Sequence, residues 1–385
     1  MVSFVSISQG ISLFFIVSSM LAGPAHAAPA SSSHSSHKNA TSSDVSTTFT
    51  LPPIISSRVT PPKVPSGNHN VEDDNVAKNK KWFEAHGGKL NVTKRADETV
   101  GGYTMDLPSN APPLPAVPST STVVIASTAQ ISEFKKYAGI ASTAYCRSVV
   151  PLNQWSCTNC LKFVPDGKLI KTFTSLITDT NGFVLRSDAQ KTIYVVFRGT
   201  NSIRSAITDL VFDLTNYTPV SGAKVHTGFY ASYKAVISDY FPAVQSQLTA
   251  YPGYKVIVTG HSLGGAQALL AGMDLYQREP RLSKSNLAIY TVGCPRVGNP
   301  AFAYYVDSTG ITFSRSVNNR DIVPHVPPQA WGFLHPGVEA WARSSSKVQI
   351  CTPNIETGLC SNSIVPFTSF TDHLTYYDIN EGLCL

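Results

Sequence analysis

Ser262 lies in a sequence context that can turn its hydroxyl into a nucleophile. It stands at the centre of the run Gly-His-Ser-Leu-Gly, residues 260–264. The apolar, β-branched residues 255–259 predict a buried strand before it, and residues 265–276, rich in helix formers, predict a helix after it. A strand, a sharp glycine-flanked turn and a helix together form the nucleophile elbow of serine hydrolases. The five-residue pattern alone is weak, so the flanking strand and helix carry the prediction.

A serine nucleophile needs a general base and an acid that orients this base. Asp321 follows a predicted strand that ends at Val317, and His373 lies in a late loop. Both keep the order serine, acid, histidine of α/β hydrolases, so we expect a triad of Ser262, Asp321 and His373. His261 is expected to shape the elbow instead. The remaining downstream candidates fit less well; they are the acids Asp307, Asp372, Asp378 and Glu381 and the histidines His325 and His335.

The negative oxygen that forms during ester cleavage needs hydrogen-bond donors that already point at it. One expected donor is the backbone N–H of Leu263, the residue after the nucleophile. The second is expected from Thr200, which follows the predicted strand 192–197 and offers both an N–H and a hydroxyl.

Residues 202–209, directly after Thr200, predict a short helix that Ser202 could cap. Its apolar stripe consists of Ile203, Ala206 and Ile207, opposite Arg204 and Ser205. Such a helix could pack its isoleucines permanently against the core, or it could be a mobile lid beside the oxyanion residue. The residues by themselves leave both interpretations open.

The residues from about 122 onward predict an α/β fold, with a sheet covered by helices on both faces. Ligands of such sheets bind at the carboxyl ends of the strands, where Ser262 is placed. The predicted strands besides 255–259 are 182–185, 192–197, 287–292 and 312–317, and the predicted helices besides 265–276 are 130–145, 230–250 and 301–307.

The first third of the chain has the composition of a processed leader. Residues 1–27 predict a secretory signal peptide, whose apolar run is too short to serve as a membrane anchor. Residues 28–95 are polar, contain too few apolar residues to fold alone and end at the dibasic pair Lys94-Arg95, so we expect a propeptide. Residues 96–121 predict a Pro-rich linker or residual propeptide, and residues 122–385 the catalytic domain.

The net charge of +6 does not indicate a nucleic-acid partner. Residues 1–95 hold nine of the 30 Lys and Arg and five of the 24 Asp and Glu, which leaves a net charge of +2 for the rest of the chain. A secreted chain with seven cysteines predicts three disulfides and one cysteine left over. Cys157 and Cys160 have no second Cys pair to complete a zinc site, so no metal is expected.

Taken together, the motifs resemble those of the filamentous-fungal class 3 triacylglycerol lipases, the Rhizopus lipases more than Rhizomucor lipase. The resemblance covers residues 123–385, and the leader is similar to the Rhizopus propeptide. The motifs that carry it are Phe-Arg-Gly-Thr at 197–200, His-x-Gly-Phe at 226–229, Gly-His-Ser-Leu-Gly-Gly-Ala at 260–266, Gly-Cys-Pro-Arg-Val-Gly-Asn at 293–299 and Asp-Ile-Val-Pro at 321–324.

This resemblance implies an α/β-hydrolase fold with a predominantly parallel sheet, and the triad and oxyanion residues named above. It also implies that Asp209 orients the Thr200 side chain. It implies a lid formed by Ser202, Ile203, Arg204, Ser205, Ala206, Ile207 and Thr208. The implied disulfides are Cys146–Cys384, Cys157–Cys160 and Cys351–Cys360, with Cys294 unpaired where a small residue is expected.

The expected activity is therefore hydrolysis of triacylglycerols at an oil–water interface by a secreted, monomeric serine hydrolase that needs no cofactor and does not insert stably into membranes. A feruloyl esterase or a phospholipase of the same fold is the nearest alternative, and a non-catalytic lipid-binding protein is a further one. Apolar residues near the site favour long acyl chains and predict an acyl pocket formed by Phe212, Phe229, Val323, Val326 and Leu374.

Overall fold

The computed structural model describes residues 49–90, 99–200, 202–352 and 355–384. Its centre is a sheet of nine strands. In sheet order these are β3 (Val123–Ile125), β13 (Lys347–Cys351), β12 (Val338–Ser344), β11 (Thr312–Asn318), β10 (Leu287–Val292), β9 (Lys255–His261), β6 (Thr192–Phe197), β5 (Thr180–Ser187) and β4 (Lys168–Ser175). The five central strands, β12 to β6, are parallel, and the outer strands pair antiparallel. The predicted α/β-hydrolase architecture is thus confirmed.

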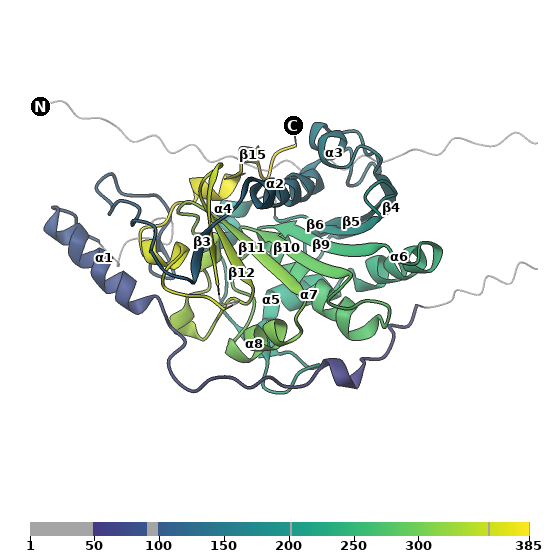
Figure 1. Cartoon of the computed structure of the whole chain (residues 1–385), viewed down its shortest axis with the longest axis horizontal. Coiled ribbons are helices and arrows are strands. Elements are labelled where there is room, and N and C mark those ends of the chain that lie inside the picture. The colour runs from purple at the N-terminus through teal and green to yellow at the C-terminus, as the bar shows by residue number, and fades with distance from the viewer. Residues whose placement is uncertain (1–48, 91–98, 201, 353–354, 385) are drawn as a thin grey trace, which may run out of the picture. The chain divides into compact units, whose positions relative to one another are not determined.

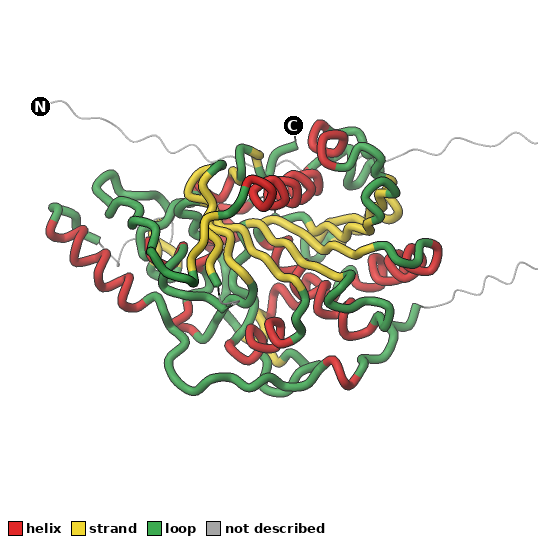
Figure 2. The backbone as a smooth tube through the Cα atoms, in the orientation of Figure 1, coloured by secondary structure: helices red, strands yellow, loops and turns green. Residues whose placement is uncertain are grey.

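Helices cover both faces of the sheet (Figures 1 and 2). They are α1 (Asp73–Ala85), α2 (Thr128–Ser142), α3 (Thr158–Phe163), α4 (Ile203–Thr208), α5 (Thr227–Lys234), α6 (Ile237–Ala250), α7 (Leu263–Arg278) and α8 (Pro300–Ser308). Three pairs of short strands lie outside the sheet: β1 (Thr99–Val100) with β2 (Tyr103–Thr104), β7 (Leu214–Asn216) with β8 (Lys224–His226), and β14 (Thr375–Tyr376) with β15 (Ile379–Asn380).

Strand β6 shows how the sequence builds two layers of core. Its six residues are all buried. Ile193 and Val195 belong to the cluster that packs against α5, α6 and α7, whereas Tyr194 and Val196 belong to the cluster under α2. Side chains of a strand alternate between its faces, so a fully apolar run fills both cores at once.

The expected strands and helices are present, with one difference. The predicted helix 230–250 is divided into α5 and α6, because the backbone leaves the helical region at Val236 (φ −123°, ψ 3°). Both pieces still bury their apolar faces against α7 and the strands β4 to β6.

The compact part of the chain begins well before residue 122, because part of the leader packs with the residues that follow it. Residues 49–385 form one compact unit. The backbone N–H of Ile55 donates to Gln277 O at 2.8 Å, and the ring of Phe83 packs on that of Phe367, 4.8 Å away. The leader buries little of its own surface but docks on the surface of the domain. The predicted signal peptide and the Lys94-Arg95 pair lie outside the described residues.

All three implied disulfides are present, and the unpaired Cys294 is buried. Burial raises the pKa of its thiol to about 12, so the thiol stays protonated and unreactive at neutral pH. In the described part of the chain, every helix is too short or too polar to span a bilayer.

Candidate active site

Ser262 stands where the parallel strand β9 ends and α7 begins. Its backbone has φ 59° and ψ −132°, a strained conformation for a residue with a side chain. The turn is so tight that a Cβ on Gly264 would lie 2.4 Å from Phe197 O. Glycine is therefore required there, and its presence lets the end of β6 approach the nucleophile. Ser262 is 3% exposed.

The structure brings His373 and Asp321 together. The distance between His373 Nδ1 and Asp321 Oδ2 is 2.8 Å, and both side chains are fully buried. Asp321 also accepts hydrogen bonds from the backbone N–H of Val323 at 2.8 Å and from the Tyr376 hydroxyl. Three donors hold this carboxylate in one orientation, which fixes the imidazole in turn. The sequence did not indicate Tyr376, because tyrosine three residues after a histidine is no recognisable motif.

Two contacts place the His373 ring beside Ser262. Val292 O accepts the Ser262 N–H at 2.9 Å, and a Cβ on the next residue, Gly293 (φ 56°), would lie 2.8 Å from His373 Cε1. On the other side the His261 ring stacks on the His373 ring, with centroids 4.4 Å apart. Among the described residues no group bonds to the buried His373 Nε2. This nitrogen is thus available to a serine proton.

The other histidines are occupied elsewhere. His261 Nδ1 bonds to the Tyr145 hydroxyl at 2.8 Å and its Nε2 to His373 O at 3.0 Å, and burial holds its pKa well below the usual range. It is a neutral ring that supports the elbow, as expected. His325 Nδ1 lies 3.1 Å from Asn362 Oδ1. His335 Nε2 bonds to Pro324 O at 2.9 Å.

Thr200 lies near the nucleophile, because the residue before it, Gly199, contacts Ser262. A Cβ on Gly199 would lie 2.9 Å from Ser262 Cβ, so the loop that leaves β6 touches the elbow. Leu263 provides the first N–H of α7, where the helix dipole favours negative charge. Thr200, Ser262 and Leu263 line the same cavity, so the two predicted oxyanion residues lie beside the nucleophile.

The short helix α4 covers Ser262. Its Ile203 and Ile207 are 7% and 5% exposed and pack in one cluster with Val323 and Val326. Between α4 and the elbow remains an apolar cavity of about 50 Å³, lined by Thr200, Ile203, Ala206, Ile207, Leu210, Phe229, Ser262, Leu263, Pro295, Val323 and Val326. This space is too small for an acyl chain, so the helix must move before a substrate can enter.

Three expected details of this region differ in the structure. Ser202 precedes α4, but its side chain makes no capping hydrogen bond. Phe212 and Leu374 do not line the cavity, unlike Phe229, Val323 and Val326. Phe212 packs on Trp331, with ring centroids 4.6 Å apart, and Leu374 lines a separate groove of about 640 Å³ outside α4. Both side chains thus flank the covered site and do not belong to its closed pocket.

The implied contact between Asp209 and Thr200 is not formed in this closed arrangement. Thr200 Oγ1 instead donates to Asp179 Oδ2 at 3.5 Å. Asp209 is the exposed residue at the carboxyl end of α4. Because Asp209 moves with this helix, its role stays a prediction for the open state.

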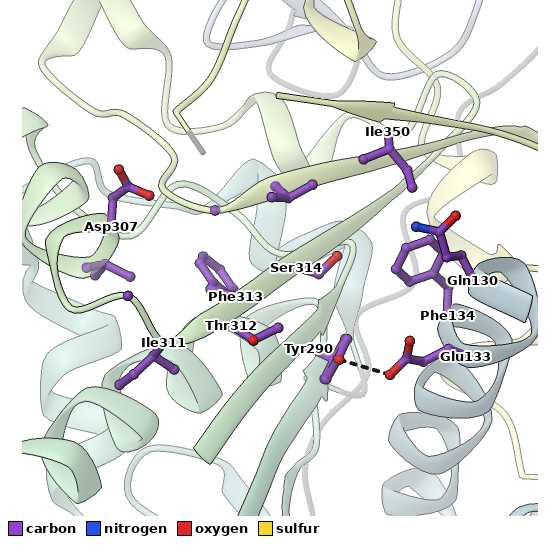
Figure 3. A pocket seen from close by; sticks show the side chains of 14 residues that line it. Gln130, Glu133, Phe134, Tyr290, Asp307, Ile311, Thr312, Phe313, Ser314 and Ile350 are labelled. Carbon is purple, nitrogen blue, oxygen red and sulfur yellow. Dashed lines mark hydrogen bonds between the residues drawn. The ribbon is translucent and has the colours of Figure 1, made fainter. Parts of the chain in front are cut away.

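A second pocket of about 370 Å³ lies at the opposite edge of the sheet, between α2 and the first residues of β11 (Figure 3). Its polar groups face each other: the Tyr290 hydroxyl donates to Glu133 Oε1 at 3.0 Å. Ser314 is its only serine, and no histidine lines it. This pocket therefore lacks a serine–histidine combination like that of Ser262 and His373.

Comparison with known proteins gives the family. The model of the Lipase (class 3) family matches residues 194–331. A lipase of Rhizopus niveus is 65% identical over the full length of both chains. The chain belongs to the class 3 lipases. The structure of the Rhizomucor miehei lipase–propeptide complex is 47% identical, covers 87% of this chain and all of its own, and superposes with a TM-score of 0.77.

Two further lipase structures, each 55% identical, cover 68% of this chain and all of their own, with TM-scores of 0.67 and 0.66. The first is a triacylglycerol lipase whose catalytic centre is formed by a serine protease triad. The second, a fungal lipase–inhibitor complex, provides a model for interfacial activation in lipases. This class 3 lipase therefore has structural relatives with a triad, with a bound inhibitor and with a bound propeptide.

Proposed function

We propose that this lipase is a secreted precursor whose mature form hydrolyses triacylglycerols at the oil–water interface. The observation that carries the proposal is the strained Ser262, with the His373–Asp321 pair behind it and an apolar helix above it. The triacylglycerol lipase with a serine protease triad and the fungal lipase that models interfacial activation support the substrate and the setting. The enzyme acts as a monomer on the lipid surface.

In the proposed mechanism Ser262 Oγ attacks the ester carbonyl while His373 Nε2 accepts its proton. Asp321 stabilises the resulting imidazolium. The negative oxygen of the tetrahedral intermediate is held by the N–H groups of Thr200 and Leu263 and by the Thr200 hydroxyl. Collapse of the intermediate breaks the ester bond, and His373 returns the proton to the leaving alcohol.

Water then repeats these steps on the acyl-enzyme. His373 removes a proton from water, the resulting hydroxide attacks the acyl carbonyl, and the fatty acid leaves as Ser262 regains its proton. Every step uses groups of the chain and water. The apolar lining from Phe229, Val323 and Val326 suits the acyl chain once α4 has moved.

For the precursor we propose residues 1–27 as signal peptide, 28–95 as propeptide, 96–121 as residual propeptide or linker, and 122–385 as the catalytic domain. The structure of the Rhizomucor miehei lipase–propeptide complex supports a leader that binds to the catalytic domain. Here the leader's Glu72 forms an ion pair with Arg296 at 2.7 Å, and α1, at the left edge of the view in Figure 1, packs its Phe83 on Phe367.

One assay tests the substrate class: the processed enzyme is given emulsified triolein, a phospholipid and methyl ferulate side by side. We expect triolein to be turned over fastest. Faster turnover of methyl ferulate or of the phospholipid would replace the proposal by the esterase or phospholipase alternative. An organophosphonate should label Ser262, and an intact protein that resists labelling would point to non-catalytic lipid binding.

A further inference from the structure

The turn between β4 and β5 carries two unusually exposed aliphatic side chains. Leu176 and Ile177 are 92% and 97% exposed, more than any other large hydrophobic residue in the described part of the chain. Turns usually hold Gly, Asn, Asp or Ser at such positions, and the left-handed residue of this turn is Asp179 (φ 44°). Neither aliphatic residue is required by the geometry of the turn.

This turn lies at the catalytic edge of the sheet. Strand β5 runs antiparallel to β6, so its beginning lies beside the end of β6, where Gly182 pairs with Phe197. Asp179 then connects the turn to the loop after β6. It accepts hydrogen bonds from Arg198 at 2.7 Å and from Thr200 Oγ1 at 3.5 Å. The exposed pair therefore stands beside the proposed oxyanion residue.

The turn is held rigidly. Ser175 pairs with Thr180 at the base of the hairpin, and the Thr178 hydroxyl bonds to the hydroxyls of Ser175 and Thr180 at 3.0 and 2.9 Å. Gln267 of α7 donates to Thr180 Oγ1 at 3.3 Å. The hydrogen bonds at the base of the turn thus hold Leu176 and Ile177 in an exposed position. The turn loses little conformational entropy when these side chains bind to a surface.

The isoleucines of the lid cannot make the first contact with a lipid surface. In the closed state Ile203 and Ile207 are buried, and they become available only after α4 has moved. We propose that Leu176 and Ile177 form a lipid anchor that enters the apolar phase before the lid opens and turns the catalytic edge toward it. The proposal rests on the proposed function, because that function supplies the lipid–water interface.

A lipid surface fits this anchor better than a protein partner does. A stable protein interface needs about 800 Å² from each side, far more than a narrow turn with two aliphatic side chains provides. Single apolar side chains can enter a lipid phase, and each contributes to the free energy of adsorption in proportion to the area it buries. The nearest charges, Arg198 and Asp179, already neutralise each other as an ion pair.

Adsorption of the full chain to triolein droplets tests the anchor. The variant Leu176→Ser/Ile177→Ser should bind about tenfold more weakly than the wild type, because two apolar contacts are lost. Its turnover of a soluble short-chain ester should stay within about twofold of the wild type, since the triad and the oxyanion residues are unchanged. The matched control is Leu161→Ser/Ile125→Ser, which removes side chains that are 52% and 60% exposed.

The control positions are remote from the anchor. Leu161 lies on α3, whose last residue, Phe163, accepts a hydrogen bond from Gln190 in the β5–β6 turn, at the opposite end of the same strands. Ile125 lies on β3, the strand at the far side of the sheet. This control should adsorb like the wild type. Equal adsorption of the anchor variant and the wild type, or an equal loss in the control, would overturn the proposal.

A probe in the turn gives a direct second measurement. The variant Ile177→Cys can be labelled with an environment-sensitive fluorophore, since Cys294 is buried and the other cysteines form disulfides. Triolein droplets should shift its emission to the blue, whereas a probe at Leu161→Cys should not respond. An unchanged spectrum at position 177 on adsorbed protein would contradict the anchor alone. A wild type that does not adsorb at all would contradict the proposed function as well.

Discussion

The two ring nitrogens of His373 have opposite surroundings, and this asymmetry determines what the residue can do. Nδ1 is bound to a carboxylate that itself accepts two further hydrogen bonds, whereas Nε2 has no partner among the described residues. The ring thus keeps one tautomer, with a free lone pair on Nε2. The sequence could predict the residues of the pair from strand ends and chain order. It could not predict Tyr376 or Tyr145, whose roles follow only from packing.

Replacing triad residues should separate the assigned base from its nearest rival. Ser262→Ala and His373→Ala should each remove nearly all turnover, because triad members act as a unit. His325→Ala should retain the chemistry, since His325 bonds to Asn362 and not to Asp321. The measurement is kcat on a soluble ester for all three variants, with circular dichroism as the check on folding. A larger loss in the His325 variant would refute the assignment of His373.

The Thr200 hydroxyl can be tested without removing the backbone donor. Thr200→Val should lower kcat about 10²-fold or more, because one donor to the transition state is lost, and should leave KM and stability nearly unchanged. Steady-state kinetics and a thermal melt provide both values. If the variant turned over ester as fast as the wild type, the oxyanion hole would consist of backbone groups only.

At the scale of elements, the parallel strands were the most predictable part of the fold. Strands β6, β9, β10 and β11 are continuous apolar runs because helices cover both of their faces. Strand β12 mixes buried Ala and Trp with Glu339 and Arg343, so it lacks such a run. Helix α1 was missed for a similar reason: its docking face, Val76, Asn79 and Phe83, is interrupted by an asparagine whose amide bonds to Ser363 O and Val365 O.

The lid helix α4 should make the reaction depend on the interface. Moving it exposes the stripe of Ile203, Ala206 and Ile207, at a cost of about 1–4 kcal/mol in water at ~25 cal/mol per Å². A lipid surface buries the stripe again, so the open state becomes dominant there. The rate on a short-chain triglyceride should therefore rise steeply once the substrate exceeds its solubility.

Ile203→Ser/Ile207→Ser should flatten this rise, because the closed state loses its apolar packing and the open state its lipid contact. Rate against substrate concentration, measured across the solubility limit, shows the change. A smooth hyperbola in the wild type would mean that α4 is an ordinary surface helix.

At the scale of the whole molecule, the leader docks on the domain through polar contacts in addition to the packing of Phe83 on Phe367. Arg58 donates to Tyr276 O and Glu279 O, and Asn75 donates to Gly358 O at 2.9 Å. Composition predicted that residues 28–95 cannot fold alone. It did not predict these polar contacts, because their partners are backbone carbonyls of the domain, which no pattern in the leader can indicate.

Expressing residues 96–385 without the leader should lower the yield of active enzyme. The leader covers surfaces of the domain, and without the leader the domain would have to order these surfaces by itself. Glu72 also provides a second carboxylate for the buried Arg296. The measurement is active-site titration per cell mass under equal oxidising conditions. Co-expression of residues 28–95 as a separate chain should restore part of the yield, and an equal yield without any leader would contradict this role.

Docking of the leader should weaken in acid. Burial by itself would raise the pKa of Glu72, but the Arg296 guanidinium and the His325 ring outweigh it and lower this pKa below its usual value of 4.5. Docking therefore favours the ionised carboxylate. The contribution of Glu72 to the free energy of docking is complete above the pKa of the undocked carboxyl. It is lost as the pH falls through the lower pKa of the docked carboxyl. Glu72→Gln removes the ionisable group and should remove this pH dependence.

Limited proteolysis of α1, measured as a function of pH, reports whether the leader is docked on the domain. In the wild type, protection of residues 73–85 should be constant near neutrality and fall as the pH drops below about 4.5. In Glu72→Gln it should be weaker at neutral pH and change little in acid, because Arg296 keeps only Glu356 in both conditions. Tryptophan fluorescence at each pH distinguishes undocking from global unfolding. If wild type and variant lost protection along the same curve while the domain stayed folded, another group would control release of the leader.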